Sequence, residues 1–204
     1  MKLDILAIAA HPDDVELTCG GTLLKMAQKG YKTGILDLTA GEMGTRGTPE
    51  TRAKEAALAA KILKVSWRGN LGVPDSDVQP TRQNKMRLAQ LIRDLRPQTV
   101  ILPYWEARHP DHYHASTLGY EGCFLAGLKR LPLTGEPHRP FKILYATSFE
   151  GMPAINPGSA RSRRTSGHAL GASKASTEIA CRMRHSTSHR EPSKAAITLA
   201  VTCE

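Results

Sequence analysis

Apolar runs and amphipathic stretches alternate along the first 147 residues of this chain. The apolar runs have the length and composition of buried strands, and the stretches between them space their apolar side chains like one face of a helix. The predicted strands are 3–10, 32–38, 65–68, 99–104 and 141–147, and the predicted helices are 22–29, 48–64, 81–96 and 114–129. This alternation predicts an α/β fold, a Rossmann-like, doubly wound and mostly parallel sheet with right-handed crossovers.

The order of the elements also predicts where a ligand would bind. In the common strand order of such a sheet, the first and fourth strands are neighbours, and ligands occupy the crevice at their carboxyl ends. The first predicted strand ends at His11 and the fourth ends just before His109. A dinucleotide site would need Gly-x-Gly-x-x-Gly after the first strand, whereas His-Pro-Asp-Asp stands there, so a nicotinamide cofactor is not expected.

Residues 10–16, Ala-His-Pro-Asp-Asp-Val-Glu, crowd an imidazole and three carboxylates where the first strand ends. Pro12 keeps the preceding residue extended. Clustered carboxylates raise each other's pKa unless a cation compensates, and imidazole with carboxylate suits zinc. Helix capping by Asp13 and Asp14 is the alternative. A second cluster, His109-Pro110-Asp111-His112, favours the metal because it too follows an apolar run.

A catalytic zinc takes three protein ligands and keeps one position open for water. We predict that His11, Asp14 and His112 hold one zinc ion per chain. Asp13 lies beside a ligand but is not needed as one, which makes it the candidate general base for the attacking water.

Two further polar residues near the clusters allow more than one interpretation. Glu16 either supports a metal ligand or is an acidic residue at a helix start. His114 is a ligand, a substrate contact or a surface helix residue, and the last is favoured because two other histidines already complete the site.

The segments AHPDDVE (10–16) and RHPDHYHAS (108–116) resemble the LmbE-like (PIG-L) family of zinc-dependent N-deacetylases. TAGEMGTRGTPETRAKEA (39–56) and GNLGVPD (69–75) resemble its bacillithiol-biosynthesis branch. The resemblance covers residues 1–149. It implies a hydrolase that removes the N-acetyl group from a small N-acetylglucosamine conjugate, in this branch N-acetylglucosaminyl-malate. It also implies a possible homo-oligomer.

The resemblance implies the same three zinc ligands and assigns two more catalytic residues. His109 would stabilise the tetrahedral oxyanion, oriented by Asp111. Arg52 and Arg108 are predicted substrate contacts, and Arg46 borders the same loops, because guanidinium groups bind carboxylates such as those of malate. The alternative for each arginine is a solvated surface charge.

Other sequence features indicate where in the cell the protein is expected and which partners are not expected. Met1-Lys2 leads straight into a strand, no apolar run is long enough for a membrane span, and the four cysteines form no CxxC pair. We therefore expect a cytoplasmic protein with reduced thiols and no membrane partner.

The last quarter of the chain differs from the rest. Residues 151–204 contain eight Lys or Arg, three Glu and no Phe, Trp or Tyr, so they supply much of the net charge of +9. Without aromatic residues this charge does not favour nucleic-acid binding. We predict a deacetylase domain at 1–150 and a poorly ordered tail, either frameshifted or lineage-specific, in which only 197–201 has a strand-like pattern.

The departure of the tail from the family pattern leaves three functional hypotheses. The leading one is a metal-dependent amidohydrolase. The second is a zinc- or sugar-binding protein with little or no turnover, because the C-terminal portion of the family is missing. The third, nucleic-acid binding, rests on charge alone.

Overall fold

The computed structural model describes residues 1–146 and the short strand at 199–200. One sheet with the strand order β3-β2-β1-β4-β5-β6 forms the centre. Strands β1 to β5 run parallel, and β6 pairs antiparallel with β5. The strands are β1 (Ile5–Ala9), β2 (Thr33–Asp37), β3 (Trp67–Asn70), β4 (Thr99–Pro103), β5 (Lys142–Ala146) and β6 (Leu199–Ala200). The predicted α/β fold with a mostly parallel sheet is confirmed.

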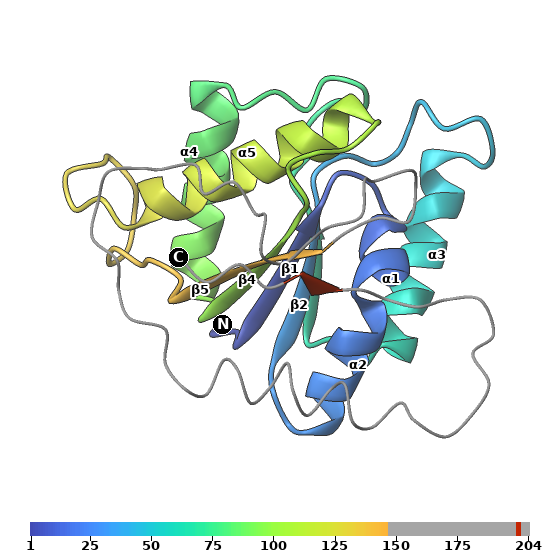
Figure 1. Cartoon of the computed structure of the whole chain (residues 1–204), viewed down its shortest axis with the longest axis horizontal. Coiled ribbons are helices and arrows are strands. Elements are labelled where there is room, and N and C mark those ends of the chain that lie inside the picture. The colour runs from blue at the N-terminus through green and yellow to red at the C-terminus, as the bar shows by residue number, and fades with distance from the viewer. Residues whose placement is uncertain (147–198, 201–204) are drawn as a thin grey trace.

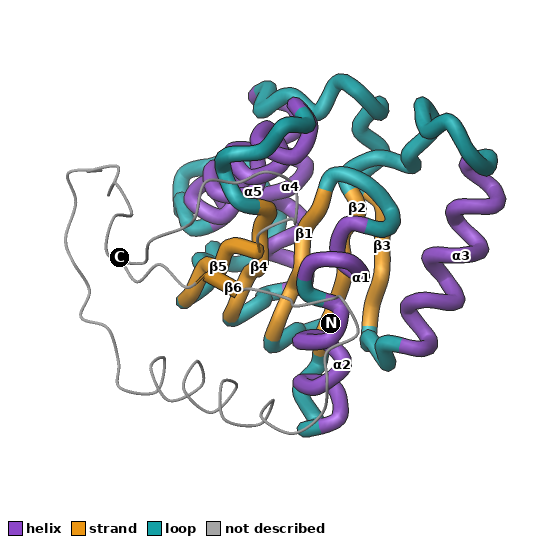
Figure 2. Tube along the Cα trace, turned by 45° about the vertical axis from the view of Figure 1, so that its right-hand side comes forward, coloured by secondary structure: helices purple, strands orange, loops and turns teal. Residues whose placement is uncertain are grey.

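Helices cover both faces of the sheet. They are α1 (Asp14–Thr18), α2 (Gly20–Gln28), α3 (Pro49–Ile62), α4 (Arg82–Leu95) and α5 (Pro110–Ala126). Helices α4 and α5 pack together on one face, while α1, α2 and α3 lie on the other (Figure 1). Figure 2 shows the same layers from a turned view, with β1 and β4 between them.

Strand β1 is the central strand and every one of its residues is buried. It pairs with β2 on one side and with β4 on the other. Because alternate side chains of a strand point to opposite faces, Leu6 and Ile8 enter the core under α4 and α5, and Ile5, Ala7 and Ala9 enter the core under α1 and α2. The continuous apolar run is therefore what a parallel strand covered on both faces requires.

Two element boundaries differ from the sequence prediction in ways that affect the site. Helix α1 was not predicted, and α5 begins at Pro110 rather than at His114. The backbone N–H of Asp111 donates to Nδ1 of His109 at 3.2 Å, so a histidine takes the place of the usual Ser or Asp cap. Pro110 then occupies the first helical position, which its fixed φ favours. As a result His112 lies in the first turn of a helix.

Helix α3 begins as predicted, with Thr48 as its cap and Pro49 at its start. Strand β3 begins later than predicted because Lys64 adopts a left-handed conformation (φ 54°) where α3 ends. The chain therefore pairs with β2 only from Trp67 onward.

The predicted domain boundary at 150 and the tail lie outside the described residues, apart from β6, which falls within the strand-like stretch 197–201. Within residues 1–146, no helix has both the length and the apolar character needed to cross a bilayer.

A buried arginine ties α4 to the end of α5. Arg93 is only 4% exposed. Its guanidinium donates to the carbonyl oxygens of Ala126 (3.0 Å), Leu128 (2.7 Å) and Leu133 (3.0 Å). These carbonyls lie at the end of α5 and in the loop after it. Carbonyl groups at a helix end have no N–H partner within the helix, so another donor must bind them. Arg93 thus closes the α4–α5 layer.

Replacing Arg93 with Leu is expected to lower the free energy of unfolding by about 2 to 4 kcal/mol, because the hydrogen bonds of a buried guanidinium to three carbonyl oxygens are lost. Urea unfolding measures the change. Arg82→Leu, on the exposed start of the same helix, is the control and should change stability by less than about 0.5 kcal/mol. Equal stability of the two variants would contradict this role of Arg93.

Candidate metal centre

The two His-Pro-Asp clusters meet at the carboxyl ends of β1 and β4. Ile5–Ala7 of β1 pair with Thr99–Ile101 of β4, so both strands deliver their following loops to the same edge of the sheet. His11 follows β1, and the loop after β4 leads to His109 at the start of α5. The rings of His11 and His109 lie 5.0 Å apart between centroids. The predicted meeting of the clusters is thus present in the structure.

His11, Asp14 and His112 each bring a potential ligand atom within 4.8 Å of the other two. Oδ2 of Asp14 lies 3.4 Å from Nδ1 of His11, and Oδ1 of Asp14 lies 3.3 Å from Nε2 of His112. The backbone N–H of His11 also donates to Oδ2 of Asp14 at 2.9 Å, which holds the carboxylate between the two rings.

The electrostatics of this cluster fit a divalent cation. Although burial raises the pKa of Asp14, hydrogen bonds from His11 and His112 hold it well below its usual range, so the carboxylate is ionised. The far nitrogen of the His11 ring, Nε2, lies 3.0 Å from Asp75 Oδ1 and 3.3 Å from Asp111 Oδ2. Two imidazoles and a carboxylate are a zinc-type donor set, and the surrounding negative charge favours a cation.

The carboxylate of Asp13 lies beside this cluster and outside the set of clustered ligand atoms. Its side chain is 54% exposed, and Oδ2 is 3.7 Å from Nη1 of Arg52. Partial burial and the charge of Asp14 raise the pKa of Asp13, while Arg52 opposes the rise. An accessible carboxylate next to a ligand is the arrangement that a general base requires.

His109 stacks on His112, with ring centroids 5.0 Å apart. Burial and the neighbouring charges of His112 and His11 lower the pKa of His109, so its neutral form is favoured. Nδ1 accepts the backbone N–H of Asp111, which leaves the ring proton on Nε2. The Asp111 carboxylate instead accepts from Ser76 N at 2.8 Å. The hydrogen bond that orients His109 therefore comes from the Asp111 backbone, and an orienting role for its carboxylate stays a prediction.

The three predicted substrate arginines have different surroundings. Arg46 and Arg108 are exposed, whereas Arg52 is largely covered by the glycine-rich loop, which we define as residues 40–47. A Cβ on Gly44 would lie 2.6 Å from Nη2 of Arg52. The loop therefore packs on the Arg52 guanidinium, which contacts the exposed carboxylate of Asp13.

Among the described residues, Glu16 makes no hydrogen bond to His11, Asp14 or His112. Its carboxylate lies in the first turn of α1 and accepts a hydrogen bond from Nη1 of Arg68. Arg68 also donates to both carboxylate oxygens of Asp37, at 2.8 and 3.0 Å. Sequence reasoning missed this network, although an acid at the end of β2 was a signal for it. The network fixes α1, and with it Asp14, to β2 and β3.

Two other residues change the picture drawn from the sequence. His114, which the sequence favoured as a surface residue of a helix, lies in α5 and is partly buried, and its Nδ1 is buried without a hydrogen-bond partner among the described residues. Two groups in the described part of the chain could hold a metal ion, namely His11, Asp14 and His112, and His11, His109 and Asp111, and His114 belongs to neither. Asp75, which carried no predicted role, contacts His11 directly. Its place in a loop at the same sheet edge was the available signal.

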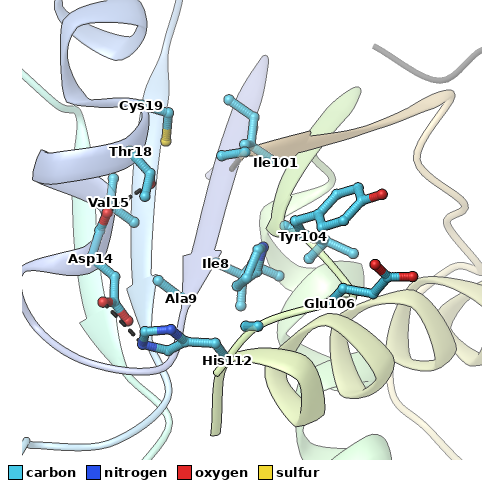
Figure 3. A pocket seen from close by; sticks show the side chains of 14 residues that line it. Ile8, Ala9, Asp14, Val15, Thr18, Cys19, Ile101, Tyr104, Glu106 and His112 are labelled. Carbon is cyan, nitrogen blue, oxygen red and sulfur yellow. Dashed lines mark hydrogen bonds and ion pairs between the residues drawn. The ribbon is translucent and has the colours of Figure 1, made fainter. Parts of the chain in front are cut away.

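A cavity opens beside the ligand cluster between β1, β4 and α1. Asp14 and His112 form part of one wall, and Tyr104 and Glu106 project from the chain segment after β4 (Figure 3). Cys19 also lines this cavity, but burial raises the pKa of its thiol to about 12, so it carries no thiolate at neutral pH. It acts as a small buried apolar residue, as the sequence indicated.

The model of one protein family, PIG-L, described as GlcNAc-PI de-N-acetylase, matches residues 6–122, more than half of the chain. The chain belongs to the PIG-L family. The matched residues include both His-Pro-Asp clusters, which confirms the resemblance drawn from segments 10–16 and 108–116.

Proteins similar to this PIG-L chain include two deacetylases and one solved structure. Over 134 residues it is 35% identical to the diacetylchitobiose deacetylase of Thermococcus kodakarensis, covering 61% of this chain and 50% of that protein. Over 136 residues it is 35% identical to the uncharacterized deacetylase YaiS of Escherichia coli, covering 57% and 72% respectively. A crystal structure of a conserved protein from Thermus thermophilus is similar with a TM-score of 0.71 and 48% identity, covering 74% and 69%. The chain thus spans half of the Thermococcus relative.

In the metal-free protein, stability is expected to fall as pH rises from about 6.5 to about 9. Burial lowers the pKa of His11, but the hydrogen bond and charge of Asp14 and the charges of Asp75 and Asp111 outweigh it and raise the pKa to about 9. The protonated ring therefore stabilises the fold below pH 6.5, by on the order of 3 kcal/mol, and this contribution is lost as pH rises through 9.

Urea unfolding of the metal-free protein at several pH values measures this dependence. His11→Gln removes the titrating ring and should flatten the curve between pH 6.5 and 9, whereas His138→Gln, far from the site, should leave it unchanged. Parallel curves for the parent and His11→Gln would refute the assignment of the slope to His11.

Proposed function

We propose that this PIG-L protein is a metal-dependent hydrolase that removes the N-acetyl group from an N-acetylglucosamine conjugate. The observation that carries the proposal is the clustering of His11, Asp14 and His112 beside the accessible carboxylate of Asp13. Membership of a deacetylase family and the names of the similar proteins support the reaction class.

His11, Asp14 and His112 would hold the metal ion, and zinc fits this donor set best. A bound ion of this kind supplies Lewis acidity, which polarises an amide carbonyl and lowers the pKa of water. With these ligands, the amide group would lie at the carboxyl ends of β1 and β4.

Asp13 acts as the general base and then as the general acid. It accepts a proton from the water that attacks the amide carbonyl carbon, and it returns that proton to the leaving nitrogen as the C–N bond breaks. The products are acetate and a free amine. The contact between Asp13 and Arg52 keeps the carboxylate beside the cluster.

His109 donates from Nε2 to the oxyanion that develops on the carbonyl oxygen. The ring is available for this because its Nδ1 already accepts the Asp111 backbone N–H. A neutral donor held in place before the reaction stabilises the transition state without reorganisation.

We extend the proposal to the substrate. Arg108 directly precedes His109 and Arg46 lies in the glycine-rich loop, both exposed, while Arg52 contacts Asp13, and guanidinium groups are suited to carboxylates. These groups support N-acetylglucosaminyl-malate, and hence bacillithiol biosynthesis, as the substrate and pathway. A homo-oligomer stays a prediction.

A metal- and sugar-binding protein without turnover is the alternative. Release of free amine from N-acetylglucosaminyl-malate and from a neutral N-acetylglucosaminide decides between the two functions. Amine from either conjugate supports the hydrolase, and faster release from the malate conjugate supports the substrate proposal. Bound zinc with no amine from any N-acetylglucosamine conjugate would favour the binding protein.

Changing His112 to Ala is expected to weaken zinc binding by more than about 100-fold, because a direct ligand contributes at least as much as the residues that support ligands. Zinc content after dialysis, measured by elemental analysis, tests this. His114→Ala on the same helix is the control and should keep its zinc. Full zinc occupancy in His112→Ala would overturn the ligand assignment.

Asp13→Asn should keep the zinc and lose about 100- to 10,000-fold of its turnover, because an amide of nearly the same shape cannot accept the proton from water. Amine release and zinc content are measured on the same sample. Asp77→Asn, an exposed acid, is the control and should keep its activity. Parent-like turnover in Asp13→Asn would mean that another group is the base.

A further inference from the structure

We propose that Asp75 is a positioning residue that selects the metal-binding nitrogen of His11 and links the glycine-rich loop, residues 40–47, to the metal centre. The inference rests on the proposed function, since it concerns the same metal site. Asp75 lies in the loop after β3, outside both His-Pro-Asp clusters, and its side chain contacts His11.

The first step is the contact between Asp75 and the His11 ring. Oδ1 of Asp75 lies 3.0 Å from Nε2 of His11, and the Asp75 side chain is only 5% exposed. Oδ2 of Asp111 approaches the same nitrogen to 3.3 Å. An imidazole nitrogen that faces two carboxylates carries the ring proton, so Nδ1 keeps its lone pair for a metal. Nδ1 is the nitrogen that faces Asp14.

The second step is the link between Asp75 and the glycine-rich loop. Oδ2 of Asp75 accepts the backbone N–H of Met43 at 2.9 Å. In return, the backbone N–H of Asp75 donates to Oε1 of Glu42 at 2.7 Å. This reciprocal pair joins the loop after β2 to the loop after β3, and the residue at the junction is the one that holds His11.

The carboxylate chemistry of Asp75 is needed for all of these contacts together. Its Oδ1 accepts the backbone N–H of Ser76 at 2.9 Å and contacts His11, while Oδ2 accepts from Met43. Asparagine offers one acceptor oxygen and one NH₂ group. In Asp75→Asn the NH₂ group would face either the Met43 N–H or the His11 Nε2–H, so one contact must be lost.

The glycine-rich loop also packs against Arg52, the arginine beside the proposed general base Asp13. Gly41 and Gly44 approach the Arg52 guanidinium, which contacts Asp13. A loop that is joined to His11 through Asp75 and lies on Arg52 is coupled to metal binding. By thermodynamic linkage, a metal that fixes the His11 ring also stabilises the loop in contact with Asp75 and Arg52, and the loop in that position favours the metal.

Direct metal ligation by Asp75 does not fit the geometry of the proposed site. Asp75 faces Nε2 of His11, whereas the ligand cluster with Asp14 and His112 lies on the Nδ1 side. Among the described residues, neither candidate metal cluster contains Asp75.

The test compares the parent, Asp75→Asn and the control Asp77→Asn, an exposed acid two residues away in the same loop. Zinc affinity is measured by competition with a chelating dye. Asp75→Asn should bind zinc about 10- to 100-fold more weakly, whereas Asp77→Asn should stay within about twofold of the parent. Zinc should slow trypsin cleavage after Arg46 in the parent and in Asp77→Asn, but much less in Asp75→Asn.

A measurement on the parent tests the nitrogen assignment without any variant. Nitrogen-15 NMR of the zinc-loaded protein should show the His11 proton on Nε2. A proton on Nδ1, or a second zinc ion bound at Nε2, would overturn the proposal even if Asp75→Asn failed to fold.

The outcomes separate this inference from the proposed function. A parent that binds no zinc contradicts the metal site itself. A parent that binds zinc tightly, with equal affinity in Asp75→Asn, contradicts only the role of Asp75. Lower stability of metal-free Asp75→Asn with unchanged zinc affinity and unchanged loop protection would mean that Asp75 is merely structural, and would overturn the inference as well.

Discussion

The parallel pairing of β1 with β4 is the constraint on which the rest of the site depends. Ile5–Ala7 pair with Thr99–Ile101, and β1 is buried on both faces, so a one-residue shift of register would exchange the side chains that the two cores receive and disturb the packing of both. The carboxyl ends of the two strands are therefore fixed side by side. His11 and His112 can meet only because the loop after β1 and the segment that leads from β4 into α5 both begin at this edge.

Several carboxylates gather at the carboxyl-end edge of the sheet. Backbone N–H groups and arginine side chains around them stabilise their negative charge. Asp75 and Asp111 accept backbone N–H groups from the loop after β3, and Arg68 neutralises the acids that anchor α1. The carboxylates near His11 are thus held by backbone N–H groups and by arginine side chains of the protein itself. Preorganised groups of this kind are what metal binding and transition-state stabilisation require, because little reorganisation remains during the reaction.

The residues that match the family model are also the residues that form the candidate metal centre. Residues 6–122 contain β1 except its first residue, β2 to β4 and most of α5, and they supply every residue assigned to the metal centre. The α4–α5 layer, closed by Arg93, supports His112 from behind. The residues assigned to the metal centre are therefore contained in one continuous part of the chain, and the proposed reaction uses no residue after His112. The scaffold extends further, because it includes β5 and the carbonyl groups at and after the end of α5 that Arg93 binds.

The sequence by itself determined the alternation of strands and helices and the two His-Pro-Asp clusters, because hydrophobic periodicity and short motifs are local properties of the chain. Strand order then predicted that His11, Asp14 and His112 would meet. Only the tertiary structure decided the contact of Asp75 with His11, the partners of Arg68 and the burial of His114. Those depend on which loops and faces come together, and residues far apart in sequence carry no local signal of their distance in space.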